Sequence, residues 1–368
     1  MAGFTYGLAV PSDDAPLRAL LDRTPIPGEI ELTFRREPSF FLAASAGNDE
    51  TQTVVCRDAE TGELLGFGER NFRRAFVDGA ESTVGYLGML RGAVERRGGL
   101  GLARGYRYFR ELHAEDPRVP FYLTTILDDN AYAVSVLASG RGGLPTYEEV
   151  GRLVTCLIPL RRRHRARSDE TTTIRDESEL PQVAAAVGEW NRRHQFGPVY
   201  DADDLAGRTP LLPGFSWRDT ILVRDGERIL GTLAVWDQSR FKQTVVTGYS
   251  GRGHAVRVPY NAYAFVRGLP GLPRPGRNVN TLHVALLTAA DDDPAIAAAL
   301  IAGARARWSA RGYAYLAVGV AEDHPLAPAL QRQAARVLRS RVYAVYWPDG
   351  PAPAFDRGMT LHLETATL

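Results

Sequence analysis

The stretch 87–105 carries the residues of the chain with the clearest potential for chemistry. Its sequence, LGMLRGAVERRGGLGLARG, runs from an apolar strand pattern through arginines and glycines into a helical pattern. Arg96, Gly99 and Gly101 have the spacing Gln/Arg-x-x-Gly-x-Gly/Ala. Glycines let a backbone approach a ligand closely, and the first amides of a helix have no partner within the helix and can bind an anion. The spacing therefore predicts a loop that holds an anion such as a pyrophosphate, and a purely structural glycine turn is the alternative.

The segments after this loop give it a context. Residues 102–115 have a helical pattern, 120–126 an apolar strand pattern, and 128–137 a second helical pattern opened by Asp or Asn as its cap. Glycines and a strand pattern at 150–160 follow. In this order the chain resembles the GCN5-related N-acetyltransferase (GNAT) family over residues 1–160.

The resemblance implies which residues hold the cofactor. In the family, a strand–loop–helix unit with this spacing binds the pyrophosphate of acetyl-CoA, and a strand–Asn–helix unit lines the pantetheine arm and the thiol. The loop has two possible registers here, because the run from Arg97 to Gly101 also matches the common RGxGxG form with one residue deleted. The predicted acetyl-CoA contacts are Met89, Leu90, Arg91, Arg96, Arg97, Gly98, Gly99, Leu100, Gly101, Leu102, Ala103, Thr124, Thr125, Ile126 and Asn130.

Acetyl transfer to an amine needs few catalytic groups, and only some have candidates here. A base or a water chain removes a proton from the amine, and an acid can protonate the thiolate. The family's usual acid is a tyrosine seven residues after the helix Asn, but Leu137 follows Asn130 at that distance. The candidates are Tyr132 on that helix, Tyr86 on the strand before the loop, and Glu69 on the adjacent strand as a base. Weaker alternatives to Tyr132 are Ser135 and Ser139.

Composition narrows the class of protein. Lys242 is the only lysine among 44 basic residues, a bias that a GC-rich genome explains and that excludes a Walker-type phosphate loop. The formal net charge of +1 gives no global field to attract nucleic acid or an anionic membrane. Cys56 and Cys156 lie in apolar strand patterns, so we expect buried free thiols. None of the seven histidines pairs with another at metal-ligand spacing, so no metal is expected.

The sequence also bears on location and partners. No basic-plus-apolar leader opens it, and no apolar run reaches about 18 residues. We therefore expect a soluble cytoplasmic protein, a monomer or homodimer, that acts on a small-molecule amine without nucleic-acid or membrane partners. The run RRRHRAR at 161–167 is interpreted as a solvated linker, with a nucleic-acid patch as the alternative.

The second half of the chain repeats the plan of the first without its ligand motif. The matching strand patterns lie at 221–227, 229–236 and 282–287, and a helical pattern at 295–311 and a strand pattern at 313–320 follow. Where the glycine loop should lie, the chain has Asp291, Asp292 and Asp293, which would repel a pyrophosphate. The period of roughly 165 residues indicates a duplication.

These patterns predict the fold class. We expect a mixed α/β (α+β) protein with two tandem GNAT-like domains, each a mostly antiparallel sheet flanked by helices. The domains are predicted at 1–165, which binds acetyl-CoA, and at 166–368, which shapes the acceptor pocket or is structural. The stretch 248–277, rich in Gly, Pro and aromatic residues, is predicted to be a long insert that packs on the first domain or over its cleft.

Three functions are compatible with these sequence patterns. The first is an acyltransferase that moves an acetyl group from acetyl-CoA to a primary amine. The second is a module that binds CoA or acyl-CoA without turnover, which the missing tyrosine and strand carboxylate favour. The third is acyl transfer from aminoacyl-tRNA, which some tandem members of this fold perform.

Overall fold

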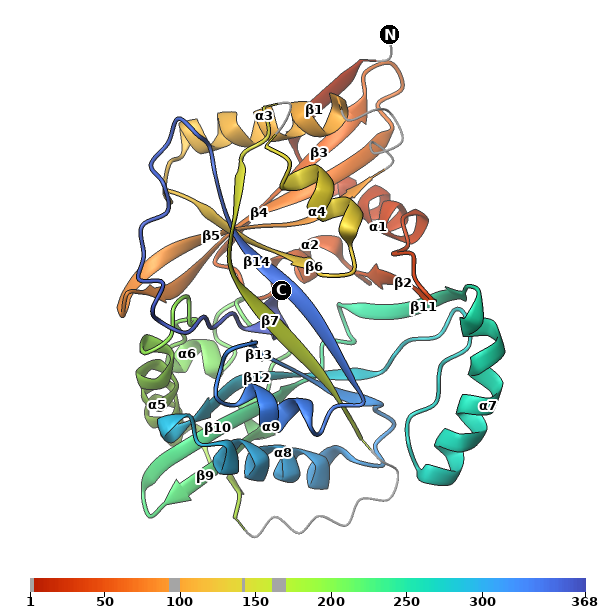
Figure 1. Cartoon of the computed structure of the whole chain (residues 1–368). Helices are drawn as coiled ribbons and strands as arrows, with labels where there is room; N and C mark the ends of the chain where they lie inside the picture. The colour runs from red at the N-terminus through yellow and green to blue at the C-terminus, as the bar shows by residue number, and fades with distance from the viewer. Residues whose placement is uncertain (1–2, 93–99, 141–142, 161–169) are drawn as a thin grey trace.

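Most of the described strands form one large sheet. The computed structural model describes residues 3–92, 100–140, 143–160 and 170–368. Within them a 12-stranded sheet has the order β1-β3-β4-β5-β6-β14-β7-β13-β12-β10-β9-β8, and β11 and β2 form a second small sheet (Figure 1). The strands are β1 (Phe4–Leu8), β2 (Ile30–Arg35), β3 (Glu50–Asp58), β4 (Leu64–Val77), β5 (Ala80–Gly92), β6 (Tyr122–Leu127), β7 (Thr146–Pro159), β8 (Thr172–Thr173), β9 (Thr220–Asp225), β10 (Arg228–Trp236), β11 (Gln243–Tyr249), β12 (Thr281–Ala289), β13 (Tyr315–Ala321) and β14 (Arg336–Tyr346).

Helices cover both faces of this sheet. The α-helices are α1 (Asp14–Arg23), α2 (Phe40–Ser45), α3 (Leu100–Glu115), α4 (Ala131–Leu137), α5 (Leu180–Arg192), α6 (Ala202–Leu205), α7 (Arg252–Arg267), α8 (Pro294–Trp308) and α9 (Ala327–Gln331). In the first half, α1 and α2 share one apolar cluster with β3 and β4, and α3 and α4 share another with β4, β5, β6 and β14. In the second half, α8 and α9 cover one face and α5 the other.

Local sequence explains the main turns and helix starts. The β4–β5 hairpin turns at Asp78 and Gly79, which both have positive φ, as a two-residue turn between twisted strands requires. Asn130 begins α4 by accepting the Ala133 N–H at 3.1 Å, and the Asp293 side chain begins α8 by accepting the Ala295 N–H. The cap residue predicted for the helix at 128–137 therefore performs that role.

Each half contains the same strand unit. β5 pairs in parallel with β6 as far as Tyr86, and β12 pairs in parallel with β13 as far as His283. Three residues later each of the two strands has a bulge with positive φ, at Met89 (52°) and Leu286 (53°). A helix that follows the bulged strand, α3 or α8, then leads to the parallel strand. The predicted fold class, a mixed and mostly antiparallel sheet flanked by helices, is confirmed. The two separate sheets that were predicted are instead one continuous 12-stranded sheet.

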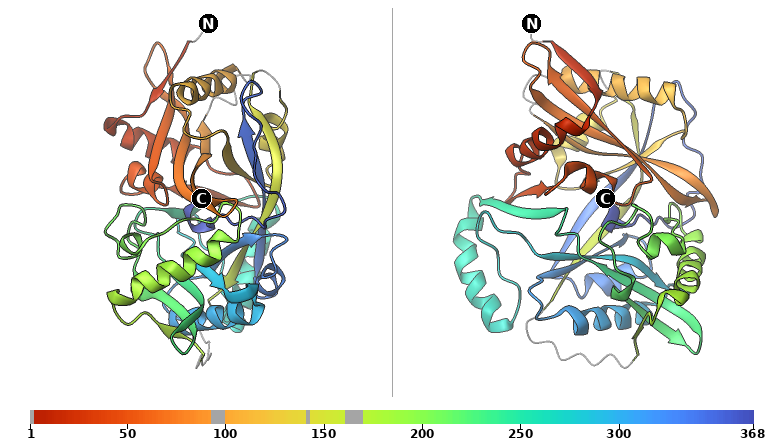
Figure 2. Two further views of the ribbon diagram at one scale, coloured as in Figure 1. Left: turned by 90° about the vertical axis from the view of Figure 1, so that its left-hand side faces the viewer. Right: turned by 180° about the vertical axis from the view of Figure 1, so that it is seen from behind.

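The two halves share their central strands. β14 lies between β6 and β7, antiparallel to both, although it is the last strand of the chain. β7 in turn pairs with β13 of the second half. Figures 1 and 2 show β7 and β14 running together from the first half into the second. The predicted domain boundary at 165 lies outside the described residues.

The stretch 248–277 differs from its predicted form. It contains the 16-residue helix α7 instead of an irregular connection, although Pro259 lies inside that helix. The preceding strand β11 pairs with β2, so the second half does contact the first here. Figure 1 shows α7 at the side of the molecule, away from the large sheet. The two cysteines, by contrast, are buried thiols, as predicted.

Candidate functional site

The parallel pair β5–β6 frames the candidate site in the first half. Pairing between the strands stops after Tyr86 and Leu123. Beyond that point the Tyr86 and Thr125 hydroxyl groups lie 2.7 Å apart and link the two strands. Met89, at the bulge, follows on β5. Since a bulge leaves one residue of the ladder unpaired, backbone groups near Met89 are free of the regular pairing.

The predicted cofactor contacts fall on both sides of this pair. Met89, Leu90 and Arg91 lie on β5 at and after the bulge, and Thr124, Thr125 and Ile126 lie on β6. Asn130 is the cap of α4. The run from Leu100 to Ala103 forms the first turn of α3, where the Tyr6 hydroxyl donates a hydrogen bond to the Gly101 carbonyl at 2.7 Å. The predicted contacts Arg96, Arg97, Gly98 and Gly99 lie outside the described residues.

Glu69 is buried and already has a partner. Its carboxylate, 3% exposed, accepts two hydrogen bonds from the Arg36 guanidinium, one of them at 3.2 Å. Arg36 lies in the loop after β2 and also packs over the Phe40 ring. Both oxygens of the Glu69 carboxylate are thus engaged by one guanidinium. The position that the sequence assigned to a base is therefore half of a buried ion pair.

Tyr86 is placed better for chemistry than Tyr132. Burial raises the pKa of the Tyr86 phenol, which therefore stays protonated near neutral pH and can donate a hydrogen bond. The Arg73 guanidinium lies over its ring at 4.9 Å and donates to the Thr367 hydroxyl of the second half at 3.0 Å. Tyr132, on α4, is 55% exposed. Of the three predicted catalytic residues, Glu69 and Tyr86 lie on adjacent paired strands, and Tyr132 lies at the surface.

In the second half, the chain itself occupies the corresponding place. The Glu364 carboxylate accepts the backbone N–H of Leu286, the bulge residue, at 2.9 Å. The 3-10 helix η6 (Thr365–Thr367) packs on both β12 and β13. Thr365 lies so close to Gly319 that a Cβ there would approach its side chain to 2.0 Å. Residues 364–367 thus fill the space beside these two strands.

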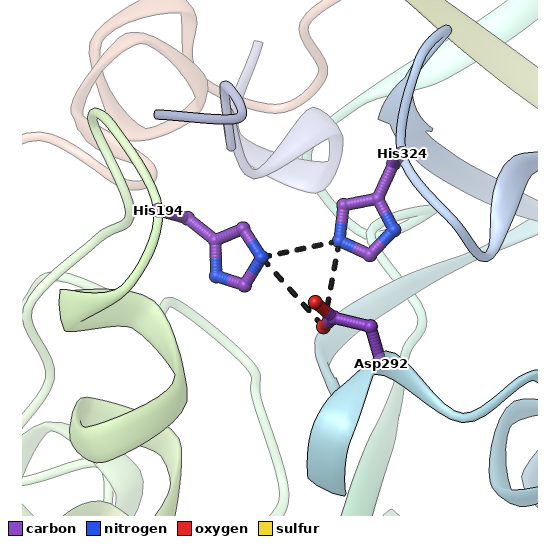
Figure 3. Close-up of side chains that lie close together, drawn as sticks. All are labelled: His194, Asp292 and His324. Atoms are coloured by element: carbon purple, nitrogen blue, oxygen red, sulfur yellow. Dashed lines mark hydrogen bonds and ion pairs between the residues drawn. The ribbon is translucent and has the colours of Figure 1, made fainter. Parts of the chain in front are cut away.

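In the second half, His194, Asp292 and His324 lie close together (Figure 3). Asp292, in the 3-10 helix η5 (Ala290–Asp292), accepts the Trp190 indole N–H at 2.9 Å. Its carboxylate also lies 3.7 Å from His194 Nε2 and 3.8 Å from His324 Nε2. The two Nε2 atoms are 3.2 Å apart. Sequence spacing did not reveal this group, because its members come from three separate segments.

Hydrogen bonding assigns the protons in this group. The Leu326 backbone N–H donates to His324 Nδ1 at 3.1 Å, so the neutral ring carries its hydrogen on Nε2. That hydrogen points to His194 Nε2, and His194 Nδ1 donates to the Trp190 carbonyl at 2.9 Å. Burial lowers the pKa of both rings, that of His324 to about 4, so both are neutral near pH 7. A cation would need a lone pair on His324 Nε2, which this hydrogen occupies.

Sequence reasoning missed three residues that shape the site. Arg36 and Arg73 are two of many arginines, and no spacing singles them out. Glu364 lies in the stretch TLHLETATL, in which polar and apolar residues are mixed, so nothing local singles it out. Burial raises the pKa of the Glu364 carboxyl to about 7, although backbone amides bind it.

Solved structures share this fold. The N-myristoyltransferase of Saccharomyces cerevisiae with bound myristoyl-CoA superposes with a TM-score of 0.62 at 9% identity, over 99% of this chain and 90% of that chain. The GCN5-related glucosamine N-acetyltransferase region of a fungal multi-domain beta-N-acetylglucosaminidase superposes with a TM-score of 0.55 at 14% identity, over 94% of this chain and 38% of that chain. No protein-family model and no curated protein sequence matches the chain. The chain therefore has a GNAT-type fold, as the sequence motifs indicated.

The lengths and hydropathies of the helices were compared with those of membrane-spanning helices. Across the described ranges, none of them is long and apolar enough to cross a membrane.

Proposed function

We propose that the chain is an N-acyltransferase that moves an acyl group, acetyl first among the candidates, from a coenzyme A thioester to the primary amine of a small molecule. The observation that carries this proposal is the difference between the halves. The first half has the bulged strand, the parallel partner strand and a helix preceded by a glycine-rich sequence, whereas the second half fills the same place with its own Glu364. One acyl-CoA per chain is the expected stoichiometry.

The likeness to known structures supports the same class of reaction. One similar structure contains myristoyl-CoA, and the other is described as a glucosamine N-acetyltransferase. Both names concern acyl transfer to nitrogen. One name refers to a myristoyl group and the other to an acetyl group. The length of the acyl group that this protein accepts is therefore tested below.

The chemistry asks little of the protein. The neutral amine attacks the thioester carbonyl carbon, the C–N bond forms, the C–S bond breaks, and the thiolate takes up a proton. Backbone amides near Met89 are suited to bind the carbonyl oxygen, and the Tyr86 phenol is suited to donate toward the departing sulfur. Because the Arg36 ion pair occupies Glu69, water is the expected proton acceptor. Orientation of amine and thioester can then supply most of the rate.

Binding is the first test. Titration calorimetry with acetyl-CoA should give one site per chain, and Gly99→Asp should weaken binding at least 100-fold, roughly 2.7 kcal/mol or more. Its added side chain and negative charge would occupy the pyrophosphate position. Ala290→Asp, which changes the corresponding loop of the second half, is the matched control and should bind normally. Two sites, or normal binding by Gly99→Asp, would contradict the assignment.

Turnover is the second test. A panel of amines with acetyl-, octanoyl- and myristoyl-CoA, followed by detection of free thiol and the mass of the product, should reveal saturable acyl transfer to at least one amine. If acyl-CoA binds but no amine raises thiol release above hydrolysis, the protein is a binding module. The burial of Glu69 in an ion pair is the observation that favours this second function.

A further inference from the structure

The only lysine of the chain lines a polar cavity. The cavity has a volume of about 280 Å³ and lies between the turn after β10, the start of β11, the start of β12 and the turn before β13. Lys242, His283, Arg311 and Tyr313 are among its lining residues. Lys242 precedes β11, which pairs with β2 of the first half. The function proposed above makes no use of this place.

The positive side chains of the cavity are only partly offset by negative ones. Among the residues that the structure describes, no carboxylate lies within 4.0 Å of the Lys242 amine or the Arg311 guanidinium. The acidic group in the lining is Asp237, and its oxygens are engaged by the Tyr313 hydroxyl at 2.8 Å and by the Ser239 N–H at 2.9 Å. The cavity therefore presents more positive than negative charge to a ligand.

Charged groups of the first half act on the Lys242 amine. Burial, together with the charges of Arg36 and Arg73, lowers its pKa to about 7, although Glu69 opposes them. His283 is kept neutral, because burial and the Lys242 charge lower its pKa to about 4. Near pH 7 the amine is thus divided between its neutral and charged forms. Arginine could not behave in this way, because it stays charged in proteins.

We propose that this cavity binds a small organic carboxylate, whose charge pairs with the Lys242 ammonium and the Arg311 guanidinium. The two positive charges, on Arg311 and on Lys242 once it gains its proton, match the two negative charges of a dicarboxylate such as succinate. The remaining lining groups, such as Asn280 and Thr281, can hydrogen-bond polar substituents of such a molecule. Phosphate fits less well, because the described lining includes no helix N-terminus and no glycine-rich turn of backbone amides. The site goes beyond the proposed acyl transfer and does not depend on it.

A single lysine makes the test direct. Full-length protein labelled with ε-¹³C-lysine gives one lysine signal, whose shift follows the charge of Lys242. We expect its titration midpoint near pH 7, and an upward shift of that midpoint when succinate is added. A midpoint that succinate leaves unchanged would overturn the proposal.

Calorimetry with two variants tests the charge pairing. Succinate should bind the wild type about tenfold more weakly at pH 8 than at pH 6, because the amine must take up a proton at the higher pH. Heats in two amine buffers of different ionisation enthalpy should show that uptake. Lys242→Arg should bind without the pH dependence or the proton uptake, and Lys242→Met should lose at least tenfold in affinity. Equal binding by Lys242→Met, or an unchanged pH dependence in Lys242→Arg, would contradict the assignment. Inorganic phosphate binding as tightly as succinate would overturn the choice of a carboxylate.

Discussion

A buried ion pair sets what Glu69 can do. With Glu69 3% exposed and Arg36 6% exposed, neither charge is solvated, and each depends on the other. Removing one partner of such a pair leaves the other charge buried and unpaired, whereas replacing both with apolar residues can be neutral. Glu69 pairs with Gly88 on β5, the strand that carries Tyr86. The ion pair can therefore fix the position of this strand without taking part in proton transfer.

The first prediction separates these roles. Glu69→Gln should lower the free energy of unfolding by about 3–5 kcal/mol, because Arg36 loses its counter-charge. Urea denaturation measures this loss, and the double variant Arg36→Met/Glu69→Leu should recover most of it. If Glu69→Gln instead keeps its stability but loses turnover with an altered pH–rate profile, Glu69 is a base after all.

The second prediction concerns Glu364. Its folded pKa, about 7, lies above the value of 4.5 expected without burial. Its contribution to stability is therefore fully present below pH 4.5 and is lost as the pH rises through 7. Glu364→Gln keeps an oxygen for the Leu286 N–H but cannot ionise. Between pH 5 and pH 8, the free energy of unfolding of this variant should rise relative to that of the wild type by on the order of 2–3 kcal/mol.

Urea denaturation at several pH values measures the Glu364→Gln effect. Glu60→Gln, on the exposed turn after β3, is the matched control and should show no such trend. A Glu364→Gln variant whose stability parallels wild type at every pH would show that the carboxyl titrates normally.

At the scale of elements, His194 and His324 join the end of α5 to the loop after β13. The pKa of His324 is about 4 in the folded protein against 6.5 without burial. A lowered histidine pKa means that the stabilising contribution is present above pH 6.5 and is lost as the pH falls toward 4. The loss attributable to His324 should be of the order of 3 kcal/mol. The variant His324→Asn, whose oxygen can still accept the Leu326 N–H, should show a shallower acid transition.

Two controls accompany this third prediction. His254→Asn, on the exposed part of α7, should retain the wild-type acid transition. Equilibration with Zn²⁺ followed by desalting should leave no stoichiometric metal, and the melting temperature should not rise. One zinc per chain would show that the proton assignment on His324 is wrong.

Elements with local signals could be predicted from the sequence, and those defined by distant partners could not. The helix 128–137 was predicted because its cap residue lies in the sequence beside it. The segment of β14, RVLRSRVYAVY, is rich in valine and tyrosine as a strand should be, but its neighbours β6 and β7 lie far away along the chain. Nothing local indicates that it belongs between them. The helix α7 was missed because Gly253 and Pro259 disfavour a helix on local grounds.

The same distinction between local signals and distant contacts applies to the candidate site. Tyr86 and Glu69 were placed on adjacent strands from the order of strands and turns, and they do lie on the paired strands β4 and β5. Arg36, which determines the behaviour of Glu69, comes from a loop 33 residues earlier that no periodicity links to β4. The chain's filling of the second half, through Glu364 and Leu286, depends on a contact across 78 residues.

At the scale of the whole molecule, the halves are interlocked. β7 of the first half pairs with β13 of the second half, and β14 of the second half pairs with β6 of the first. Further contacts fix their junction, including an ion pair of 2.8 Å between Arg74 and Asp204 and hydrogen bonds between Asp78 and Gln195. The candidate acyl site thus lies in a half that is incomplete without the other.

The last prediction follows from this interlocking. A fragment of residues 1–165 keeps β6 and β7 but lacks β14, whose Val342 and Val345 are fully buried. The two strands would then expose apolar faces and unpaired edges, which favour aggregation. We expect the fragment alone to aggregate, and co-expression with residues 166–368 to give a soluble one-to-one complex, because β14 can then enter between its partners. Size-exclusion chromatography with light scattering distinguishes the two states. A monodisperse fragment 1–165 that binds acetyl-CoA as well as the full chain would show that β14 is not needed to complete the first half.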